Sequence, residues 1–307
     1  MRIDQEQLQQ YGHLSLIAKQ AVEGFITGLH KSPYHGFSVE FAEHKIYNKG
    51  ESTKNIDWKL FARTDKLFVK NFEEETNLRC YTIIDNSSSM YFPFDNGKLL
   101  NKISFSCYAA AAIMHMLKKQ RDAMGLYIFS DKIESAIGPK STSLHHKLLI
   151  SELERLLIPI STETRKTTFA SSALHEIADR IHKRSLVLVF SDMFDNAAET
   201  KDDLFAALQH LKYNKHEILL FHVVDKKKEM DFEFENRPHN FIDVESGEEV
   251  KVHPNEVKTT YTKAIQAYKQ ELKHKCGQYG IEFIEADINQ GFNQVLLPYL
   301  IKRIKMS

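Results

Sequence analysis

Residues 80–89 hold an apolar run followed at once by polar side chains: Cys80-Tyr81-Thr82-Ile83-Ile84, then Asp85-Asn86-Ser87-Ser88-Ser89. The apolar run is typical of a buried strand. Directly after it, one carboxylate and two hydroxyls alternate along the chain, so that Asp85, Ser87 and Ser89 can converge on a small cation. Hard cations such as Mg²⁺ prefer oxygen ligands and readily keep waters. The alternative is a serine-rich turn, in which Asp and Ser side chains bond their own backbone.

From residue 79 onward, strand patterns alternate with helix patterns. We expect strands at 79–84, 124–129, 133–137, 186–190, 217–224 and 281–284, and helices at 98–119, 144–157, 171–183, 202–211, 256–276 and 292–305. Residues 186–190 are apolar throughout, as in a strand that is covered on both faces. The alternation predicts an α/β fold, a doubly wound and mostly parallel sheet flanked by helices.

Two parts of the chain are distinguished by their patterns. Residues 79–307 are predicted to form the α/β domain, with a small β-hairpin insertion at about 226–254. Residues 1–78 form an N-terminal extension that we expect to pack on that domain. This extension holds Asp57-Trp58 and Arg63, which indicate either a surface for a partner or a buried ring beside an ion pair.

Composition excludes several classes of protein. The 307 residues are 42% hydrophobic and 27% charged, as in soluble globular proteins, and 41 basic residues balance 41 acidic ones, which argues against a general nucleic-acid binder. Three cysteines without C-x-x-C spacing indicate reduced thiols. There is no apolar signal core and no apolar stretch of membrane-spanning length. We therefore expect a soluble, cytoplasmic protein, with its 15 histidines in solvated or capping roles and Lys226-Lys227-Lys228 at a solvated loop tip.

Two further polar positions are expected at the sheet edge where Asp85 lies. The strand at 186–190 runs directly into Ser191-Asp192, and Thr168 precedes the helix at 171–183. Ligands of open α/β sheets gather outside the carboxyl ends of the strands. Together these residues make an all-oxygen set suited to Mg²⁺ or Mn²⁺: Asp85, Ser87, Ser89, Thr168 and Asp192. Taken singly, Thr168 is equally well explained as a helix N-cap and Asp192 as an ordinary loop aspartate.

The order D-x-S-x-S, then a threonine loop, then an aspartate after a buried strand resembles the von Willebrand factor type A domain. The metal-ion-dependent adhesion site of that domain uses these elements. In the resemblance, Asp85, Ser87 and Ser89 match the first loop, Thr168 the second and Asp192 the third. Lys166-Thr167 replaces the usual glycine pair and Phe169 replaces the following acid, so Thr167 stays open as an alternative ligand.

The segment before this motif contains several distinctive stretches in one order, which include Gly28-Leu29-His30-Lys31-Ser32-Pro33, Tyr47-Asn48-Lys49-Gly50, Ile56-Asp57-Trp58 and Ala62-Arg63-Thr64. Together these stretches resemble a bacterial family, domain of unknown function family 58. The resemblance implies a von Willebrand factor type A-like fold. It also implies a MoxR-type AAA+ ATPase as partner and a role in chaperone-like assembly or maturation.

The expected function is a non-enzymatic protein-interaction module, in which a partner's carboxylate completes the coordination of one Mg²⁺ or Mn²⁺. That partner is expected to be the AAA+ ATPase or its client. The alternative is a Mg²⁺-dependent phosphohydrolase with Asp85 as nucleophile. A haloacid-dehalogenase pattern would need a second aspartate where the chain has Ser87, and G-x-S-x-G and the glycine-rich nucleotide motifs do not occur. Nucleic-acid binding is a third hypothesis, which the neutral charge disfavours.

Overall fold

The computed structural model describes residues 14–30, 44–46, 58–64, 67–70, 78–94, 100–158, 170–194, 201–243 and 247–306. The chain divides into two compact units, Met1–Phe25 with Leu78–Ser307, and Ile26–Asn77. Thr168, its alternative Thr167 and Asp57 lie outside the described residues, as does the side chain of Trp58.

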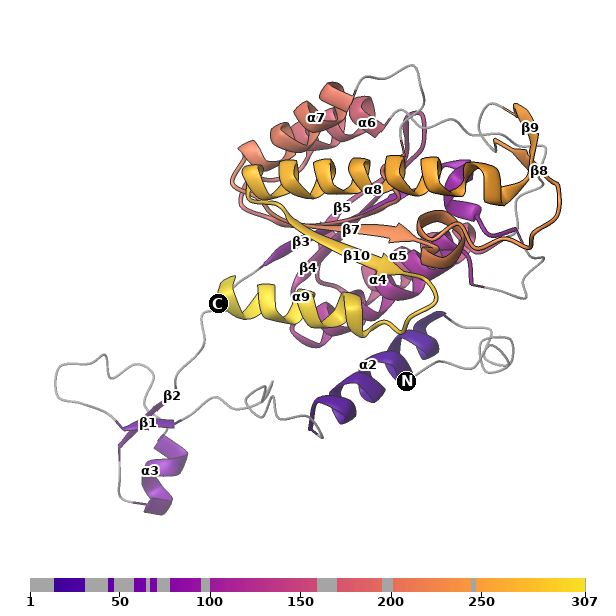
Figure 1. Cartoon of the computed structure of the whole chain (residues 1–307). Coiled ribbons are helices and arrows are strands. Elements are labelled where there is room, and N and C mark those ends of the chain that lie inside the picture. Colours follow the sequence, from indigo (N-terminus) through magenta and orange to yellow (C-terminus); the bar gives the residue numbers. More distant parts are fainter. Residues whose placement is uncertain are drawn as a thin grey trace. The chain divides into compact units, whose positions relative to one another are not determined.

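The larger unit is built on a six-stranded sheet (Figure 1). Its strands lie in the order β10-β7-β6-β3-β4-β5, and all neighbours are parallel except β5, which is antiparallel to β4. This arrangement confirms the predicted doubly wound, mostly parallel α/β fold. The strands are β3 (Arg79–Asp85), β4 (Ala123–Phe129), β5 (Ile133–Lys140), β6 (Leu186–Ser191), β7 (Glu217–Val224) and β10 (Glu282–Asp287).

Helices cover both faces of this sheet. Figure 1 shows α6 (Ala170–Arg180), α7 (Lys201–Tyr213) and α8 (Pro254–Tyr279) on one face, and α4 (Lys102–Lys119), α5 (Ser143–Leu156) and α9 (Asn293–Met306) on the other. All six residues of β6 are buried, as its apolar run predicts. Burial of apolar side chains on both faces is the main driving force for this three-layer arrangement.

The order of the strands creates a switch point in the middle of the sheet. From β3 the chain moves outward through β4 to β5, and it then returns to β6 on the other side of β3 and continues through β7 to β10. The connections therefore leave β3 and β6 in opposite directions. In open α/β sheets, ligands bind outside the carboxyl ends of the strands at such a point.

Smaller elements complete the described part of the chain. The helix α2 (Leu14–His30) starts in the larger unit, where the backbone N–H of Leu14 donates to Glu154 on α5 at 3.3 Å. The smaller unit contains α3 (Trp58–Thr64) and an antiparallel pair, β1 (His44–Ile46) with β2 (Phe68–Lys70). That residues 1–78 as a whole pack on the α/β domain stays a prediction.

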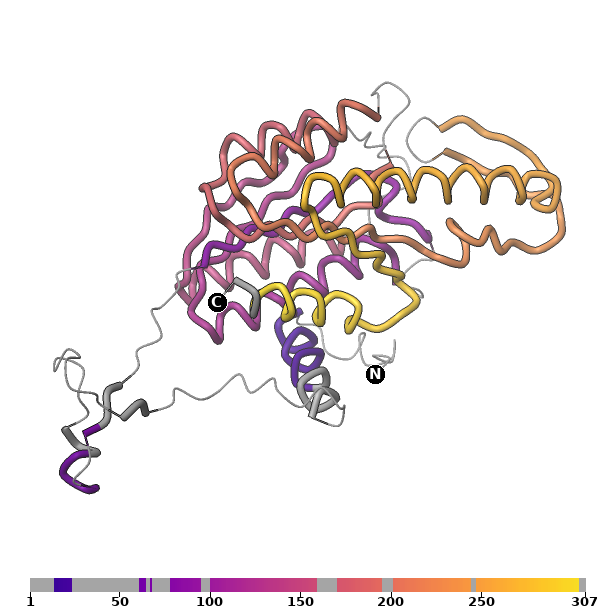
Figure 2. Tube along the Cα trace, turned by 60° about the vertical axis from the view of Figure 1, so that its left-hand side comes forward, coloured from indigo at the N-terminus to yellow at the C-terminus, as the bar shows by residue number. Residues whose placement is uncertain are grey.

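The predicted hairpin insertion is present. Strands β8 (His239–Ile242) and β9 (Glu249–Val252) pair antiparallel, and Figure 2 shows them at the end of the larger unit where α8 begins. The ring of Phe232 stacks on Phe241 at 5.5 Å and lies 4.6 Å from Tyr261 of α8, so the hairpin is attached through an aromatic cluster.

Two expectations about polar side chains need correction. The three lysines at 226–228 belong to a π-helical turn, η3 (Lys226–Met230), rather than to a loop tip, although Lys226 and Lys227 are exposed as expected. In this turn the Asp225 carboxylate accepts the backbone N–H of Lys228. Four histidines are buried rather than solvated, because they lie on core-facing positions of α5 or in and beside β7: His145, His146, His216 and His222. Among the described residues, no helix is long and apolar enough to cross a membrane.

Candidate metal centre

The register between β3 and β6 brings two polar residues together at the switch point. Ile84 pairs with Phe190, so the next residues, Asp85 and Ser191, lie level with each other. The Ser191 hydroxyl donates to Asp85 Oδ2 at 2.6 Å. Asp192 follows immediately, and the side chains of Asp85, Ser191 and Asp192 are all fully buried. The two predicted carboxylates therefore meet beneath the surface at the carboxyl edge of the sheet.

The loop after β3 gathers the predicted hydroxyls on one side. The backbone N–H of Ser87 donates to Asp85 Oδ1 at 2.9 Å, and the hydroxyl oxygens of Ser87 and Ser89 lie 3.0 Å apart. Asn86 is turned to other partners, since its amide donates to Glu134 at 2.8 Å and accepts from the Tyr91 hydroxyl at 2.7 Å. This anchoring of Asn86 holds the alternate residues, Asp85, Ser87 and Ser89, together.

The electrostatics of the site are those of crowded carboxylates. Burial and the nearby charge of Asp192 raise the pKa of Asp85 to about 7, although hydrogen bonds from Ser191 and Ser87 oppose the rise. A carboxylate that is buried beside another one is stabilised in its ionised form by a cation. The site at the end of β3 and β6 therefore favours a bound positive charge.

One positive charge is already present, and the sequence analysis did not identify it. Lys102, the first residue of α4, is fully buried, and its Nζ donates to Asp192 Oδ2 at 2.7 Å. The same Nζ donates to Glu229 Oε1 at 2.5 Å. Burial lowers the pKa of Lys102, but the charges of Asp192 and Glu229 outweigh burial and hold this pKa above its ordinary value. The ammonium is therefore fixed in its charged form between two carboxylates.

Glu229 reaches the site from η3. Its second oxygen accepts the backbone N–H of Asp225 at 2.7 Å, so the carboxylate links Lys102 to the end of β7. Burial raises the pKa of Glu229 above its ordinary value, although the charge of Lys102 opposes the rise. Asp192 is held on its other side, because the backbone N–H of Phe194 donates to its Oδ1 at 3.2 Å.

The signals for these additional residues differ in strength. Lysine is unfavourable in the first turn of a helix, where the macrodipole is positive, so Lys102 at the start of α4 indicates a tertiary partner. Ser191 directly precedes Asp192 and could have been included with it. Glu229 lies in a lysine-rich run of the sequence and carries no such signal.

The donor atoms match the preference of a small hard cation. Asp85, Ser87, Ser89 and Asp192 offer only oxygen, and neighbouring ligands of an octahedral Mg²⁺ are roughly 3 Å apart, as the two serine hydroxyls are. Within the described residues, no three or more His, Cys, Asp or Glu side chains are placed to hold a metal ion. A cation at this site would therefore depend on hydroxyls as well as carboxylates, and Thr168 lies outside the described residues.

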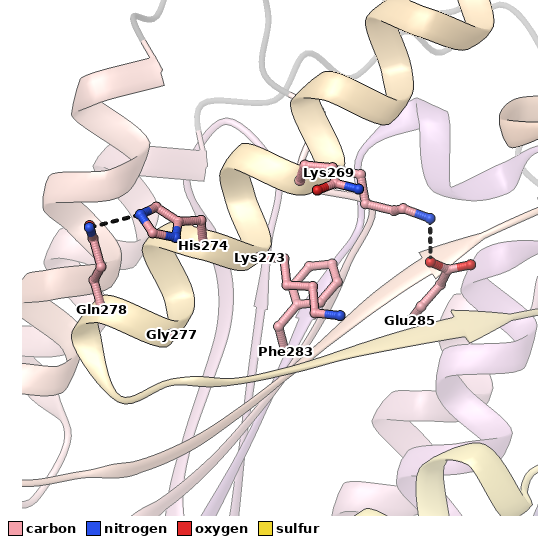
Figure 3. A pocket seen from close by; sticks show the side chains of 8 residues that line it. Lys269, Lys273, His274, Gly277, Gln278, Phe283 and Glu285 are labelled. Atoms are coloured by element: carbon pink, nitrogen blue, oxygen red, sulfur yellow. Dashed lines mark hydrogen bonds and ion pairs between the residues drawn. The ribbon is translucent and has the colours of Figure 1, made fainter.

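A separate cavity of about 790 Å³ lies between α8 and β10 (Figure 3). It is lined by Lys269, Lys273, His274, Phe283 and Glu285, among others. Lys269 donates to Glu285 at 2.7 Å across it. None of the predicted site residues lines this cavity, so it is distinct from the candidate metal centre.

The fold and the site together define the class of this protein. It is a doubly wound α/β domain with a buried, acidic, oxygen-rich site at the switch point of its sheet. The chain belongs to the family described as "Protein of unknown function DUF58", whose model matches residues 43–271. The predicted family is thereby confirmed.

The chain is similar to mycobacterial proteins over part of its length. The chain is 25% identical over 137 residues to the uncharacterized proteins Mb1516 of Mycobacterium bovis and Rv1480 of Mycobacterium tuberculosis. The match covers 45% of this chain and 42% of each relative, so the chain spans less than half the length of these relatives.

Two structural neighbours share low sequence identity with the chain. BatB from Bacteroides thetaiotaomicron has 13% identity and a TM-score of 0.46, with 75% of this chain and 100% of that chain covered. The VWA domain of SpRpn10 has 12% identity and a TM-score of 0.36, with 71% and 93% covered.

Proposed function

We propose that this protein is a metal-dependent protein-interaction module of the adhesion-site type. In this proposal Asp85, Ser87 and Ser89 hold one Mg²⁺ or Mn²⁺, and Asp192 and Thr168 contribute directly or through water. A carboxylate from a protein partner fills a position that the chain leaves to water. The observation that supports the proposal most strongly is the meeting of Asp85 and Asp192, both fully buried, at the switch point of the sheet.

Charge supports a role for a divalent cation. Among the described residues, the buried group contains the carboxylates of Asp85, Asp192 and Glu229 and the ammonium of Lys102, which leaves an excess of two negative charges when all are ionised. Buried charges are costly unless they are paired or coordinate a metal. A divalent cation balances this excess and remains able to attract an anionic oxygen of a partner.

The partner we propose is a MoxR-type AAA+ ATPase or one of its clients, and the site of action is the cytoplasm. The resemblance to the type A adhesion site motivates a carboxylate-bearing partner, and the family resemblance motivates the ATPase. The role that follows is assembly or maturation of other proteins, without chemistry performed by this chain.

Calorimetric titration of the metal-free protein with Mg²⁺ and Mn²⁺ tests the site. We expect one binding event in the wild type, and at least a tenfold loss of affinity in Asp85→Ala, because a charged ligand is removed. The control is Asp179→Ala, which removes an aspartate whose side chain is 74% exposed on α6 and which should bind as the wild type does. Equal binding by wild type and Asp85→Ala, or binding by neither, contradicts the proposal.

A pull-down from cell extract tests the partner. Immobilised wild type is expected to retain the AAA+ ATPase or its client in Mg²⁺ and to release it when a chelator is added. Asp85→Ala should retain neither protein under either condition. Retention that is unchanged by the chelator would contradict a metal-bridged interaction.

The alternative, a Mg²⁺-dependent phosphohydrolase, requires Asp85 to attack phosphorus. The carboxylate is fully buried, and both of its oxygens accept hydrogen bonds, from Ser87 and Ser191. A small ion can reach such a group more readily than a phosphate ester can. Metal-dependent turnover of generic phosphate esters that disappears in Asp85→Asn would favour this alternative over the interaction module.

A further inference from the structure

Lys102 is a lysine without access to solvent at the centre of the candidate site. The exposed fraction of its side chain is 0%, as is that of Asp192, while Glu229 is 14% exposed. Its ammonium lies 2.7 Å from Asp192 and 2.5 Å from Glu229, and 5.6 Å from the centre of the Phe194 ring. A buried lysine of this kind persists only where its charge is compensated, so these contacts are integral to the site.

The same contacts occupy Asp192. One of its oxygens accepts from Lys102 and the other from the backbone N–H of Phe194. A divalent cation drawn to Asp192 meets a positive charge already within hydrogen-bond distance of that carboxylate. Cation and ammonium repel each other, and both are stabilised by the same group.

We infer that Lys102 is a built-in competitor of the divalent cation, which neutralises Asp192 when no metal is bound and lowers the affinity of the site for metal. This inference rests on the proposed metal-binding function. Glu229 gives the ammonium a second partner that does not depend on Asp192. When a cation takes Asp192, Lys102 keeps Glu229, whose position is fixed by its hydrogen bond from the backbone N–H of Asp225.

The inference gives Lys102 and Glu229 a regulatory role. Metal binding exchanges one counterion of Asp192 for another, so Asp192 itself is paired in the metal-free site rather than left as an unpaired buried charge. Occupancy then becomes sensitive to the metal concentration and to a partner carboxylate that adds affinity. The site is thereby set to hold its cation firmly only when the partner is also present.

The double variant Lys102→Met/Glu229→Gln tests this role. It removes one positive and one negative charge, so the net charge around the site stays the same, and the amide introduced by Glu229→Gln keeps an oxygen for the backbone N–H of Asp225. Because Asp192 is freed from its ammonium, we expect Mg²⁺ to bind about tenfold more tightly than in the wild type by calorimetry. Affinity equal to or weaker than that of the wild type overturns the inference.

The matched control is Lys269→Met/Glu285→Gln, which removes an ion pair of 2.7 Å at the cavity between α8 and β10 (Figure 3). It should bind Mg²⁺ as the wild type does. Should the first double variant fail to fold by circular dichroism, Glu229→Gln alone replaces it. That variant leaves Lys102 only Asp192 as a partner, so weaker Mg²⁺ binding is expected, and unchanged or tighter binding overturns the inference.

The proposed function and this inference fail differently. If neither the wild type nor the double variant binds Mg²⁺, both the function and the inference are overturned. If the wild type binds, Asp85→Ala does not, and the double variant equals the wild type, the function stands and the inference is lost.

Discussion

At the scale of single residues, burial changes the chemistry of side chains that are ordinary elsewhere. Burial and the charge of Asp192 raise the pKa of Asp85 to about 7, and burial raises the pKa of the Cys276 thiol to about 12. The three cysteines are all free and buried. The residue types alone would not distinguish these groups from exposed ones, because the shifts come from their surroundings.

His146 makes stability dependent on pH. It is 4% exposed, its Nε2 has no hydrogen-bond partner within the described residues, and burial, followed by the charges of Lys118, His115 and His145, lowers its pKa to about 4. The unfolded chain binds the proton near pH 6.5, so this histidine supports folding above that pH and the support is lost as pH falls toward 4. We expect His146→Leu to remove this dependence.

Urea unfolding of wild type and His146→Leu measures the effect. The stability of the wild type relative to the variant should fall by about 2 kcal/mol between about pH 7.5 and about pH 5. His274→Leu, at an exposed histidine of α8, is the control and should show no such change. A difference that is the same at both pH values would contradict the prediction.

At the scale of elements, the antiparallel pairing of β4 and β5 depends on one glycine. A Cβ at Gly125 would lie 2.8 Å from the carbonyl oxygen of Ile137 and 3.1 Å from the Tyr81 ring. The backbone atom cannot move without disturbing the pairing, where the register shifts between Met124 and Leu126. The contact explains why a glycine lies within a buried strand.

Gly125→Ala is therefore expected to lower the free energy of unfolding by about 1–3 kcal/mol, through overpacking. The matched control is Gly138→Ala on β5, where a Cβ would meet nothing within 4 Å. That substitution should change stability by less than about 0.5 kcal/mol. Denaturant unfolding of both variants decides the matter, and equal losses at the two positions would refute the packing explanation.

At the scale of the whole α/β unit, a buried ion pair connects the last helix to the sheet. Arg303 of α9 lies 2.6 Å from Asp122, which directly precedes β4 and is 2% exposed on its side chain. Burial raises the pKa of Asp122 to about 6, and the charge of Arg303 opposes that rise. The pair joins residues that are far apart in the sequence, so it connects α9 to the start of β4.

Arg303→Met is expected to cost about 3 kcal/mol at alkaline pH, because it leaves the buried Asp122 without this cation. Without the charge of Arg303 the pKa of Asp122 rises further above about 6, so the variant takes up a proton at higher pH than the wild type does, and the cost should shrink as pH falls to about 6. Arg180→Met, which breaks a half-exposed pair with Glu176 on α6, should cost less than about 1 kcal/mol. Thermal unfolding across pH checks this, and a cost independent of pH would contradict it.

The sequence by itself determined which segments become strands and helices, and which three motif residues share a loop. Local periodicity carries that information, as the run at 186–190 shows, since a strand covered on both faces is apolar throughout. The sequence also predicted that Asp85 and Ser191-Asp192 lie at the same edge of the sheet, because each of them follows a buried strand. The lysine-rich run at 226–228 was misread, since the Asp225 carboxylate that caps its π-helical turn is a local contact that composition obscures.

Only the tertiary structure decided the order of the strands, the register and the charge balance of the site. Pairing β3 with β6, rather than with β5 or β7, is what places Asp85 level with Ser191. Lys102 and Glu229 are 127 positions apart, yet their charged atoms meet at Asp192. No short-range pattern encodes such a meeting, because it depends on how α4 and η3 pack against the sheet, and that packing turned a predicted all-oxygen site into one that already holds a cation of its own.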